Sequence, residues 1–220
     1  EIRAAVVAQP FPADLEADIR SAYAELAGPD DQASFAVRSS ATAEDLPDDL
    51  GPLRRAIEDA IPVGFHTHAD QIDPRRVRGV DTKGLDKFWK GFDDLHTGVS
   101  QLRAKAGKQL GTLGGGNHFL EVCLDTSGDV WLMLHSGSRN IGKELAERHI
   151  AIARKLPHNA DLPDRDLAVF LANTPEMEAY RRDLYWAQEY ARRNRALMAE
   201  LVAAHLPGVG YRPPEGTYLA

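Results

Sequence analysis

Five polar side chains around one short predicted hairpin have residue types that suit metal or phosphate chemistry: Asn117, His118, Glu121, His135 and Arg139. Neutral imidazoles are common ligands of borderline transition metals, so the two histidines are candidate metal ligands. Asn117 and Glu121 can offer oxygen atoms to a metal or to a nucleotide. Arg139 lies at a turn before a predicted helix, where a guanidinium is suited to hold a phosphate or a similar oxyanion.

A glycine-rich run and a predicted β-hairpin must position these side chains. Gly111-Thr-Leu-Gly-Gly-Gly116 frees the backbone to approach a ligand closely and to adopt positive φ. Phe119–Leu124 and Val130–Leu134 are apolar runs typical of strands, and turn-forming residues separate them. A hairpin of this length predicts that His118 and His135 lie towards one end of the sheet.

Most of the remaining chain has helical patterns. Apolar residues at helical spacing predict helices over residues 14–27, 50–61, 142–156 and 175–204, and a packed helical turn over residues 85–95. We therefore predict an α+β fold, in which a central antiparallel element at residues 113–135 is packed by helices at residues 138–156 and 175–204.

The last of these helices has the clearest signals. Thr174 is the expected N-cap and Pro175 the first helical residue. The predicted inner stripe consists of Met177, Tyr180, Leu184, Ala187, Ala191, Asn194, Met198 and Leu201. Five arginines occupy the rest of the helix: Arg181, Arg182, Arg192, Arg193 and Arg195. Because acidic residues are interspersed, a solvated face is favoured over an RNA contact.

Two other features are weaker candidates for chemistry. His66 and His68 would share one face of an extended segment, and two imidazoles can chelate a metal, although an ordinary solvated loop is favoured. His149 is interpreted as a residue at the edge of the core or in an interface. Cys123, the single cysteine, is expected to be a buried small hydrophobe.

Composition limits the class of protein. The chain has 220 residues, 43% hydrophobic and 27% charged, which is ordinary for one globular domain. A net charge of −7 argues against non-specific coating of nucleic acid but allows a local basic patch. No apolar run approaches the roughly 20 residues that cross a bilayer, and one cysteine fits a reducing compartment. We expect a cytoplasmic protein without membrane contact, and composition leaves its oligomeric state open.

Two sequence blocks resemble a known family. Leu113-Gly-Gly-Gly-Asn-His-Phe-Leu-Glu121 and Leu134-His-Ser-Gly-Ser-Arg139 are similar to signature blocks of the RtcB-type RNA ligases. The likeness extends over about residues 46–204 and includes Tyr185-Trp-Ala-Gln-Glu-Tyr-Ala-Arg-Arg-Asn-Arg195. It implies a GTP- and Mn²⁺-dependent ligase that joins RNA ends, such as tRNA halves, carrying a 3′-phosphate or cyclic phosphate and a 5′-hydroxyl.

The resemblance also assigns roles, and the chain departs from some of them. His118 and His135 match two manganese ligands, and Asn117 and Glu121 match residues that contact the guanylate. The family's nucleophile is a histidine followed by Gly-Ala-Gly-Arg, but none of the eight histidines here precedes a glycine. Upstream Asp and Cys ligands and a later His-Asn ligand have no counterpart either. The resemblance therefore implies part of a metal site and no ligation by this chain alone.

The two ends of the chain resemble other families. Residues 1–48, with Ala36-Val-Arg-Ser-Ser-Ala-Thr-Ala-Glu-Asp-Leu-Pro47, are similar to phosphoenolpyruvate synthases, whose matching segment binds ATP. Residues 205–220 are similar to PLP-dependent aminotransferases and lyases. We therefore expect three segments: a head at 1–45, a ligase-like partial domain at 46–204 and a tail at 205–220. The alternative functions are a non-catalytic scaffold of recombined segments, whether natural, misassembled or engineered, and an ATP-binding fragment.

Overall fold

A computed structural model describes residues 50–124 and 130–204 of the chain. The predicted helix at 14–27 and the segments 1–45 and 205–220 lie outside the described residues. The helices of the described part are α3 (Leu50–Ala60), α4 (Leu85–Lys90), α5 (Arg103–Gln109), α6 (Arg139–Ala153) and α7 (Pro175–Ala203), with short 3-10 turns between them. None of these helices is both long enough and apolar enough to cross a membrane.

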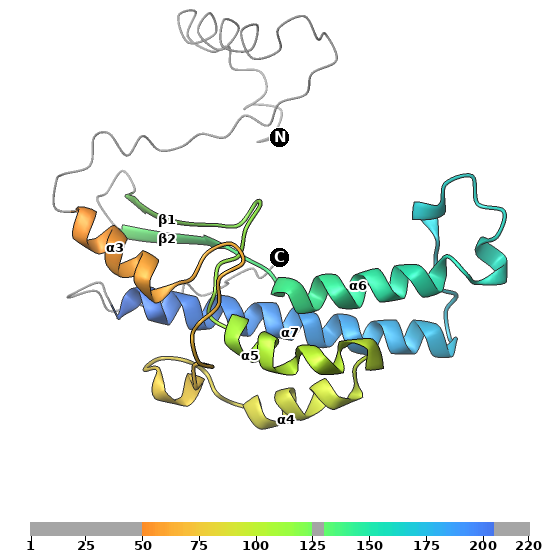
Figure 1. Cartoon of the computed structure of the whole chain (residues 1–220), viewed down its shortest axis with the longest axis horizontal. Coiled ribbons are helices and arrows are strands. Elements are labelled where there is room, and N and C mark those ends of the chain that lie inside the picture. Colours follow the sequence, from red (N-terminus) through yellow and green to blue (C-terminus); the bar gives the residue numbers. More distant parts are fainter. Residues whose placement is uncertain (1–49, 125–129, 205–220) are drawn as a thin grey trace, which may run out of the picture. The chain divides into compact units, whose positions relative to one another are not determined.

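The two strands form the predicted antiparallel hairpin. β1 (Phe119–Leu124) pairs with β2 (Val130–His135), with Phe119 opposite His135 at the open end. One face of the hairpin turns Leu120, Leu132 and Leu134 towards a hydrophobic cluster that includes residues of α7. A small antiparallel sheet packed by helices confirms the α+β prediction (Figure 1).

Helix α7 begins as its sequence indicates. The Thr174 hydroxyl accepts a hydrogen bond from the Met177 backbone N–H, and Pro175 takes the first helical position. The side chain therefore satisfies one of the backbone donors left unpaired at a helix start. Over its 29 residues α7 packs against α6, α3 and β2, and Figure 1 shows it running beneath the hairpin and alongside α6.

The buried face of α7 is wider than the predicted stripe. Ala187, Ala191, Asn194 and Met198 are buried as expected. The stripe omitted seven further residues that are also buried: Asp183, Trp186, Tyr190, Arg193, Leu197, Ala199 and Val202. It included Leu184, which is only half-buried. The reason is that neighbours contact α7 on several sides, so a single line of residues cannot describe its interior face.

An aromatic cluster joins α7 to the segment around α4. Phe88 stacks on Trp186 with ring centroids 4.8 Å apart, and Phe92 meets the same indole edge-on at 5.3 Å. The Trp186 indole N–H also donates to the Phe88 carbonyl at 2.9 Å. The predicted packed turn at residues 85–95 is therefore confirmed as α4 followed by a 3-10 turn, Gly91–Asp94.

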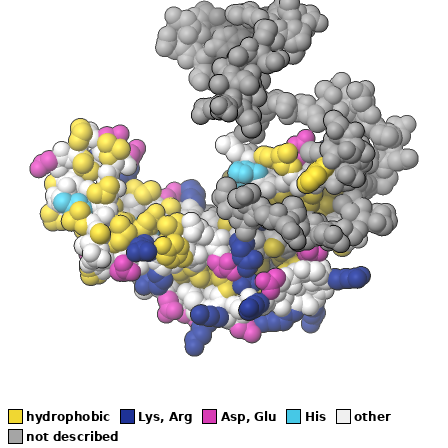
Figure 2. Space-filling model, turned by 180° about the vertical axis from the view of Figure 1, so that it is seen from behind, with side chains coloured by type: hydrophobic (Ala, Val, Ile, Leu, Met, Phe, Trp, Pro, Cys, Tyr) yellow, Lys and Arg dark blue, Asp and Glu magenta, His cyan; other side chains and the backbone are white. Residues whose placement is uncertain are grey.

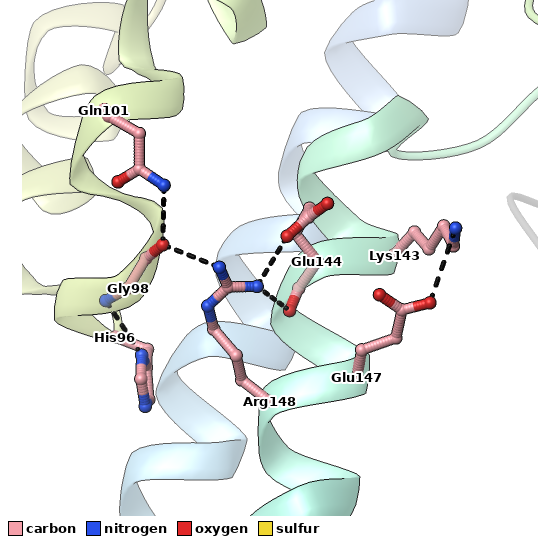
Figure 3. Close-up of polar contacts among 7 residues, drawn as sticks. All are labelled: His96, Gly98, Gln101, Lys143, Glu144, Glu147 and Arg148. Carbon is pink, nitrogen blue, oxygen red and sulfur yellow. Dashed lines mark hydrogen bonds and ion pairs between the residues drawn. The ribbon is translucent and has the colours of Figure 1, made fainter.

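Polar contacts attach α6 to its surroundings. Arg148 donates to the Gly98 carbonyl at 2.8 Å and pairs with Glu144 at 2.6 Å (Figure 3). On the buried side, His149 Nε2 lies 2.8 Å from Asp183 Oδ2, which also accepts from the His96 backbone N–H at 3.1 Å. His149 is thus a buried, paired residue in the interface between α6 and α7.

Candidate metal and nucleotide site

The glycine-rich loop lies against residues 62–64. Leu113 N donates to the Pro62 carbonyl at 3.0 Å, and Gly64 N donates to the Gly114 carbonyl at 2.9 Å. Gly114 has φ +97°, and a side chain there would collide with the Arg139 guanidinium and the His118 ring. Glycine is therefore required at this position both for its backbone conformation and for space.

The two candidate histidines meet at the open end of the hairpin. The ring centroids of His118 and His135 are 5.9 Å apart, and Phe119 stacks on His135 at 5.7 Å. A metal bound to both rings, with metal–nitrogen distances of about 2.1 Å, allows centroids up to roughly 6–7 Å apart. The separation of the two rings lies within this range. No group of three His, Cys, Asp or Glu suited to a metal occurs within the described residues.

The surroundings of His118 favour its neutral form. Burial lowers the pKa of His118 below 6.5, and the nearby charges of Arg139 and His135 lower it further. The Leu113 carbonyl raises this pKa by a smaller amount. His118 Nδ1 is buried. A neutral imidazole is suited to bind a metal ion.

Arg139 connects three segments of the site. It is the first residue of α6 and has φ +58°, which is unusual for a non-glycine residue. Its Nε donates to Thr112 Oγ1 at 2.9 Å, and Nη2 donates to the Gly64 carbonyl at 2.8 Å. Burial lowers the pKa of Arg139. Two of the three side-chain nitrogens of Arg139 are thus already hydrogen-bonded to other residues of the chain. Arg139 therefore links the loops beside the histidines.

Asn117 and Glu121 flank the histidines from β1 and its preceding loop. Asn117 is exposed, directly after the glycines, while Glu121 is half-buried and opposite Met133. Because side chains alternate along a strand, Glu121 lies on the same hairpin face as His135. This face is the one that turns away from the leucines of the inner cluster.

Asn194, which the sequence pattern places on the inner stripe of α7, also forms hydrogen bonds with both loops beside the candidate histidines. Its side chain is fully buried on α7. Asn194 Oδ1 accepts from Gly111 N at 2.7 Å and Thr112 N at 3.2 Å. Nδ2 donates to the Thr112 carbonyl, Ser136 Oγ and the Gly137 carbonyl at 3.1–3.3 Å. One amide therefore fastens the loop before His118 to the loop after His135.

Two further hydrogen bonds join Ser136 to the glycine-rich loop and to α7. Ser136 Oγ donates to the Leu113 carbonyl at 2.7 Å, and Arg195 donates to the Ser136 carbonyl at 2.8 Å. The sequence shows an amide, Asn194, in a line of positions expected to be buried. A buried amide needs hydrogen-bond partners, so the pattern indicates that Asn194 has some. The sequence did not indicate which partners it has.

The weaker candidates have structural partners. His68 Nε2 lies 3.0 Å from the Gly111 carbonyl, and burial lowers the pKa of His68, while His66 is exposed. Arg192 and Arg193 both pair with Glu189 at 2.7–2.8 Å. Arg193 is only 8% exposed, so it does not lie on a solvated face as the sequence predicted. The Cys123 side chain lies outside the described residues.

Comparisons with known proteins agree with the ligase resemblance. A family profile described as tRNA-splicing ligase RtcB matches residues 12–215. The chain is 39% identical to the RNA-splicing ligase RtcB of Escherichia coli K12 over 181 residues, covering 79% of this chain and 44% of that protein. It is 30% identical to the tRNA-splicing ligase RtcB of Methanococcus maripaludis over 202 residues, covering 76% and 42%. The Aeropyrum pernix tRNA-splicing ligase RtcB is 32% identical over 134 residues, covering 53% and 28%.

These matches define how much of the family the chain covers and which of its residues belong to it. The chain spans less than half the length of the curated relatives it matches. The family match begins at residue 12 and ends at residue 215, beyond the expected range of 46–204 on both sides. The comparisons give no support to the phosphoenolpyruvate-synthase resemblance of residues 1–48 or to the aminotransferase resemblance of residues 205–220.

Proposed function

The chain belongs to the family of tRNA-splicing ligases described as RtcB, and on this premise we propose that it carries part of the metal and nucleotide centre of such an enzyme. In this proposal His118 and His135 bind one Mn²⁺ ion. Asn117 and Glu121 contact the guanylate of GTP, and Arg139 contacts a phosphate of the nucleotide or RNA. The substrates are RNA ends with a 3′-phosphate or cyclic phosphate and a 5′-hydroxyl, and the protein acts in the cytoplasm.

The observation that carries this proposal is the pairing of two histidines at one hairpin end. Their ring centroids are 5.9 Å apart, and Nδ1 of His118 is buried. Burial keeps the pKa of His118 low, so the ring is neutral and able to donate a lone pair at neutral pH. A bound Mn²⁺ ion would supply Lewis acidity that offsets negative charge on phosphate oxygens.

The neighbouring residues can position a phosphate beside that pair. The Arg139 guanidinium is held over the glycine-rich loop by Thr112 and Gly64, so its positive charge is fixed in place. A fixed guanidinium needs no reorganisation when an oxyanion arrives. Asn117 and Glu121 supply an amide and a carboxylate close in sequence to His118, and these groups can accept hydrogen bonds from a guanine base or a ribose.

A manganese titration tests the proposal. Wild-type chain should bind Mn²⁺ weakly, because two protein ligands leave most of the coordination shell to water. His118→Ala should abolish binding detected by electron paramagnetic resonance, and His135→Ala should do the same. The matched control is His158→Ala, since His158 is exposed on another segment, with its Nε2 2.9 Å from the Val169 carbonyl oxygen. Equal binding by wild type and His118→Ala would remove this site from consideration.

The alternative function is a non-catalytic scaffold made of recombined segments. GTP binding distinguishes a ligase-type centre from a scaffold. A ligase-type centre should bind GTP more tightly when Mn²⁺ is present, whereas a scaffold should bind neither GTP nor Mn²⁺. A preference for ATP over GTP would instead favour the ATP-binding alternative.

A further inference from the structure

The segment around α4 and α5 is basic, although the chain as a whole is acidic. Of the chain's 26 lysines and arginines and 33 acidic residues, nine and four lie in residues 74–108, which leaves 17 and 29 for the rest of the chain. Figure 2 shows Lys and Arg side chains gathered along the lower edge of the molecule, and Figure 1 shows that α4 forms this edge. A local basic surface of this kind attracts a polyanion in spite of the negative net charge.

Several exposed cations of this segment have no acidic partner in the described part of the chain. Lys87 and Lys90 lie one turn apart on α4, and both side chains are exposed. The ion pairs found within residues 50–124 and 130–204 involve neither of these lysines, nor Arg78, Lys83 or Lys105. Their charge is therefore not neutralised by the described residues.

Two hollows lie beside Trp89, a half-buried residue of α4. The larger hollow has a volume of about 430 Å³, and its lining includes Trp89, Gln101 and Arg103. The smaller hollow has a volume of about 330 Å³, and its lining includes Trp89, Gln71 and Arg75. Both volumes fall within the range of about 300–1,000 Å³ that is typical of ligand sites. Each hollow thus combines an indole, an amide and a guanidinium.

The two arginines are held in place at these hollows. Arg103 Nη1 donates to the Trp89 carbonyl at 2.9 Å and to Asp93 at 3.0 Å. The guanidinium carbon of Arg103 lies 5.9 Å from the centroid of the Trp89 ring. In the other hollow, Arg75 pairs with Asp86. A guanidinium fixed beside an indole can contact a phosphate while a base packs on the ring, and single-strand binding surfaces use this combination.

Single-stranded RNA matches these features better than other polyanions do. Its phosphates suit the lysines, and its unstacked bases suit hollows that contain an aromatic ring and amides able to hydrogen-bond base edges. A duplex keeps its bases stacked inside and would leave the hollows empty. An acidic peptide would meet the cations, but it offers carboxylates rather than flat rings to Trp89.

The candidate metal and nucleotide site lies in another part of the molecule. Figure 1 shows α7 between α4 and the hairpin that ends at His135. The contact of α4 with α7 is the buried aromatic cluster in which Phe88 stacks on Trp186. An RNA segment on the α4 side is therefore held away from the two candidate histidines and leaves them free for the end of an RNA chain.

We propose that the surface formed by Arg75, Lys87, Trp89, Lys90 and Arg103, called the α4 surface below, binds an internal single-stranded segment of RNA. The lysines contact phosphates, and a base packs against Trp89 in one of the two hollows. The choice of RNA rests on the proposed function, whereas the surface itself requires neither Mn²⁺ nor GTP.

The test measures binding of an oligouridylate of about 12 nucleotides, a length within the roughly 4–16 nucleotides that a single-strand site covers. The RNA carries fluorescein on an internal base and a hydroxyl group at each end, so it has no terminal phosphate. Fluorescence anisotropy is measured with the full chain in buffer containing EDTA and no nucleotide. Wild-type chain should bind this RNA, and the affinity should fall as salt rises from about 50 to about 200 mM.

Lys87→Glu/Lys90→Glu should bind the RNA at least about tenfold more weakly at the lower salt concentration. The slope of log affinity against log salt should fall in magnitude by about 1.4, because each phosphate contact with a single strand contributes roughly 0.7. The matched control is Lys143→Glu/Lys155→Glu, which makes the same charge change at two exposed lysines outside the α4 surface and should bind as wild type does. Circular dichroism and thermal unfolding establish that all variants are folded.

Tryptophan fluorescence tests the contact with a base. RNA should quench the fluorescence of wild-type chain, because a base stacked on an indole quenches it, and Trp89→Phe should lose most of this quenching. The matched control is Trp131→Phe, since Trp131 is 51% exposed on the hairpin and should leave the quenching unchanged.

Four outcomes would overturn the proposal. They are no RNA binding by wild type, equal binding by the two double lysine variants, quenching that Trp89→Phe retains in full, and competition by polyglutamate that is as strong as competition by unlabelled RNA. The last result would assign the surface to acidic peptides.

His118→Ala separates this proposal from the proposed function. This variant should bind RNA as wild type does, even though it should bind no Mn²⁺. A matching loss of RNA binding in His118→Ala would place the RNA at the hairpin and would overturn the assignment to the α4 surface. Because the RNA assay contains EDTA, the manganese titration can fail while RNA binding holds, and the reverse.

Discussion

The Asn194 amide on α7 donates a hydrogen bond of 3.2 Å to Ser136 Oγ, on the residue that directly follows His135. The oxygen of the same amide accepts from Gly111 N at 2.7 Å, at the start of the loop that leads to His118. One buried side chain therefore connects the segments that carry both candidate ligands. We therefore expect Asn194 to help set the separation of the two imidazoles.

We predict that Asn194→Ala lowers Mn²⁺ affinity about tenfold or more, as loss of a residue that orients metal ligands typically does. It should also lower the free energy of unfolding by on the order of 1–3 kcal/mol, because several buried backbone groups lose their partner. Electron paramagnetic resonance of Mn²⁺ and urea denaturation measure the two effects separately.

Asn159→Ala is the matched control for this prediction. Asn159 is also buried, and its amide donates to the Ala153 and Val169 carbonyls at 2.8 Å, away from the histidines. Asn159→Ala should lower the free energy of unfolding by a similar amount and leave the Mn²⁺ affinity unchanged. If both variants weaken metal binding equally, Asn194 acts only through general stability.

The second prediction concerns pH. Burial lowers the pKa of His118 below 6.5, so the unfolded chain binds a proton more readily than the folded chain. This contribution to stability is fully present above pH 6.5 and is lost as the pH falls through the folded-state pKa. Burial lowers the pKa of His68 as well, so His68 contributes with the same sign.

Denaturant unfolding at several pH values between about 5 and 7.5 checks this prediction. Stability should rise with pH over this range, and His118→Gln should flatten the rise. NMR titration of the His118 ring should give a midpoint below 6.5. A midpoint above 6.5 would show that the ring is not held in its neutral form.

The third prediction concerns the core of α7. Leu197 is fully buried, so Leu197→Ala should cost about 2–5 kcal/mol of unfolding free energy. Leu184→Ala should cost less, because Leu184 is only half-buried. Deletion of residues 1–44 should also cost less than Leu197→Ala, as expected if the head is a separate segment. Unfolding of the chain on head deletion alone would contradict the proposed division into segments.

The fourth prediction is that this chain alone forms no covalent guanylate adduct and joins no RNA ends. Nucleophilic catalysis requires the attacking side chain itself, and binding contacts at other residues cannot replace it. None of the eight histidines has the Gly-Ala-Gly-Arg sequence that follows the nucleophile in the resembled family. Incubation with radiolabelled GTP and Mn²⁺, followed by denaturing electrophoresis, measures the adduct. A label that survives denaturation would mean that another histidine serves as nucleophile.

Local pattern by itself determined the elements that carry the site. The hairpin at 119–135, the cap at Thr174 and the helices around it follow from residue spacing and from short-range backbone chemistry. Because a hairpin has a definite register, the sequence also indicated that His118 and His135 lie at one end of the sheet.

Only the tertiary structure decided how the site is held together. Asn194 bonds to Gly111 and Ser136, which are 83 and 58 residues away in the chain, and Arg139 bonds to Gly64, 75 residues away. The pairing of His149 with Asp183 is another long-range contact. Periodicity shows that a position is buried, but the partner of a buried polar group depends on which elements pack together. That packing is set by the whole chain, so no local pattern contains it.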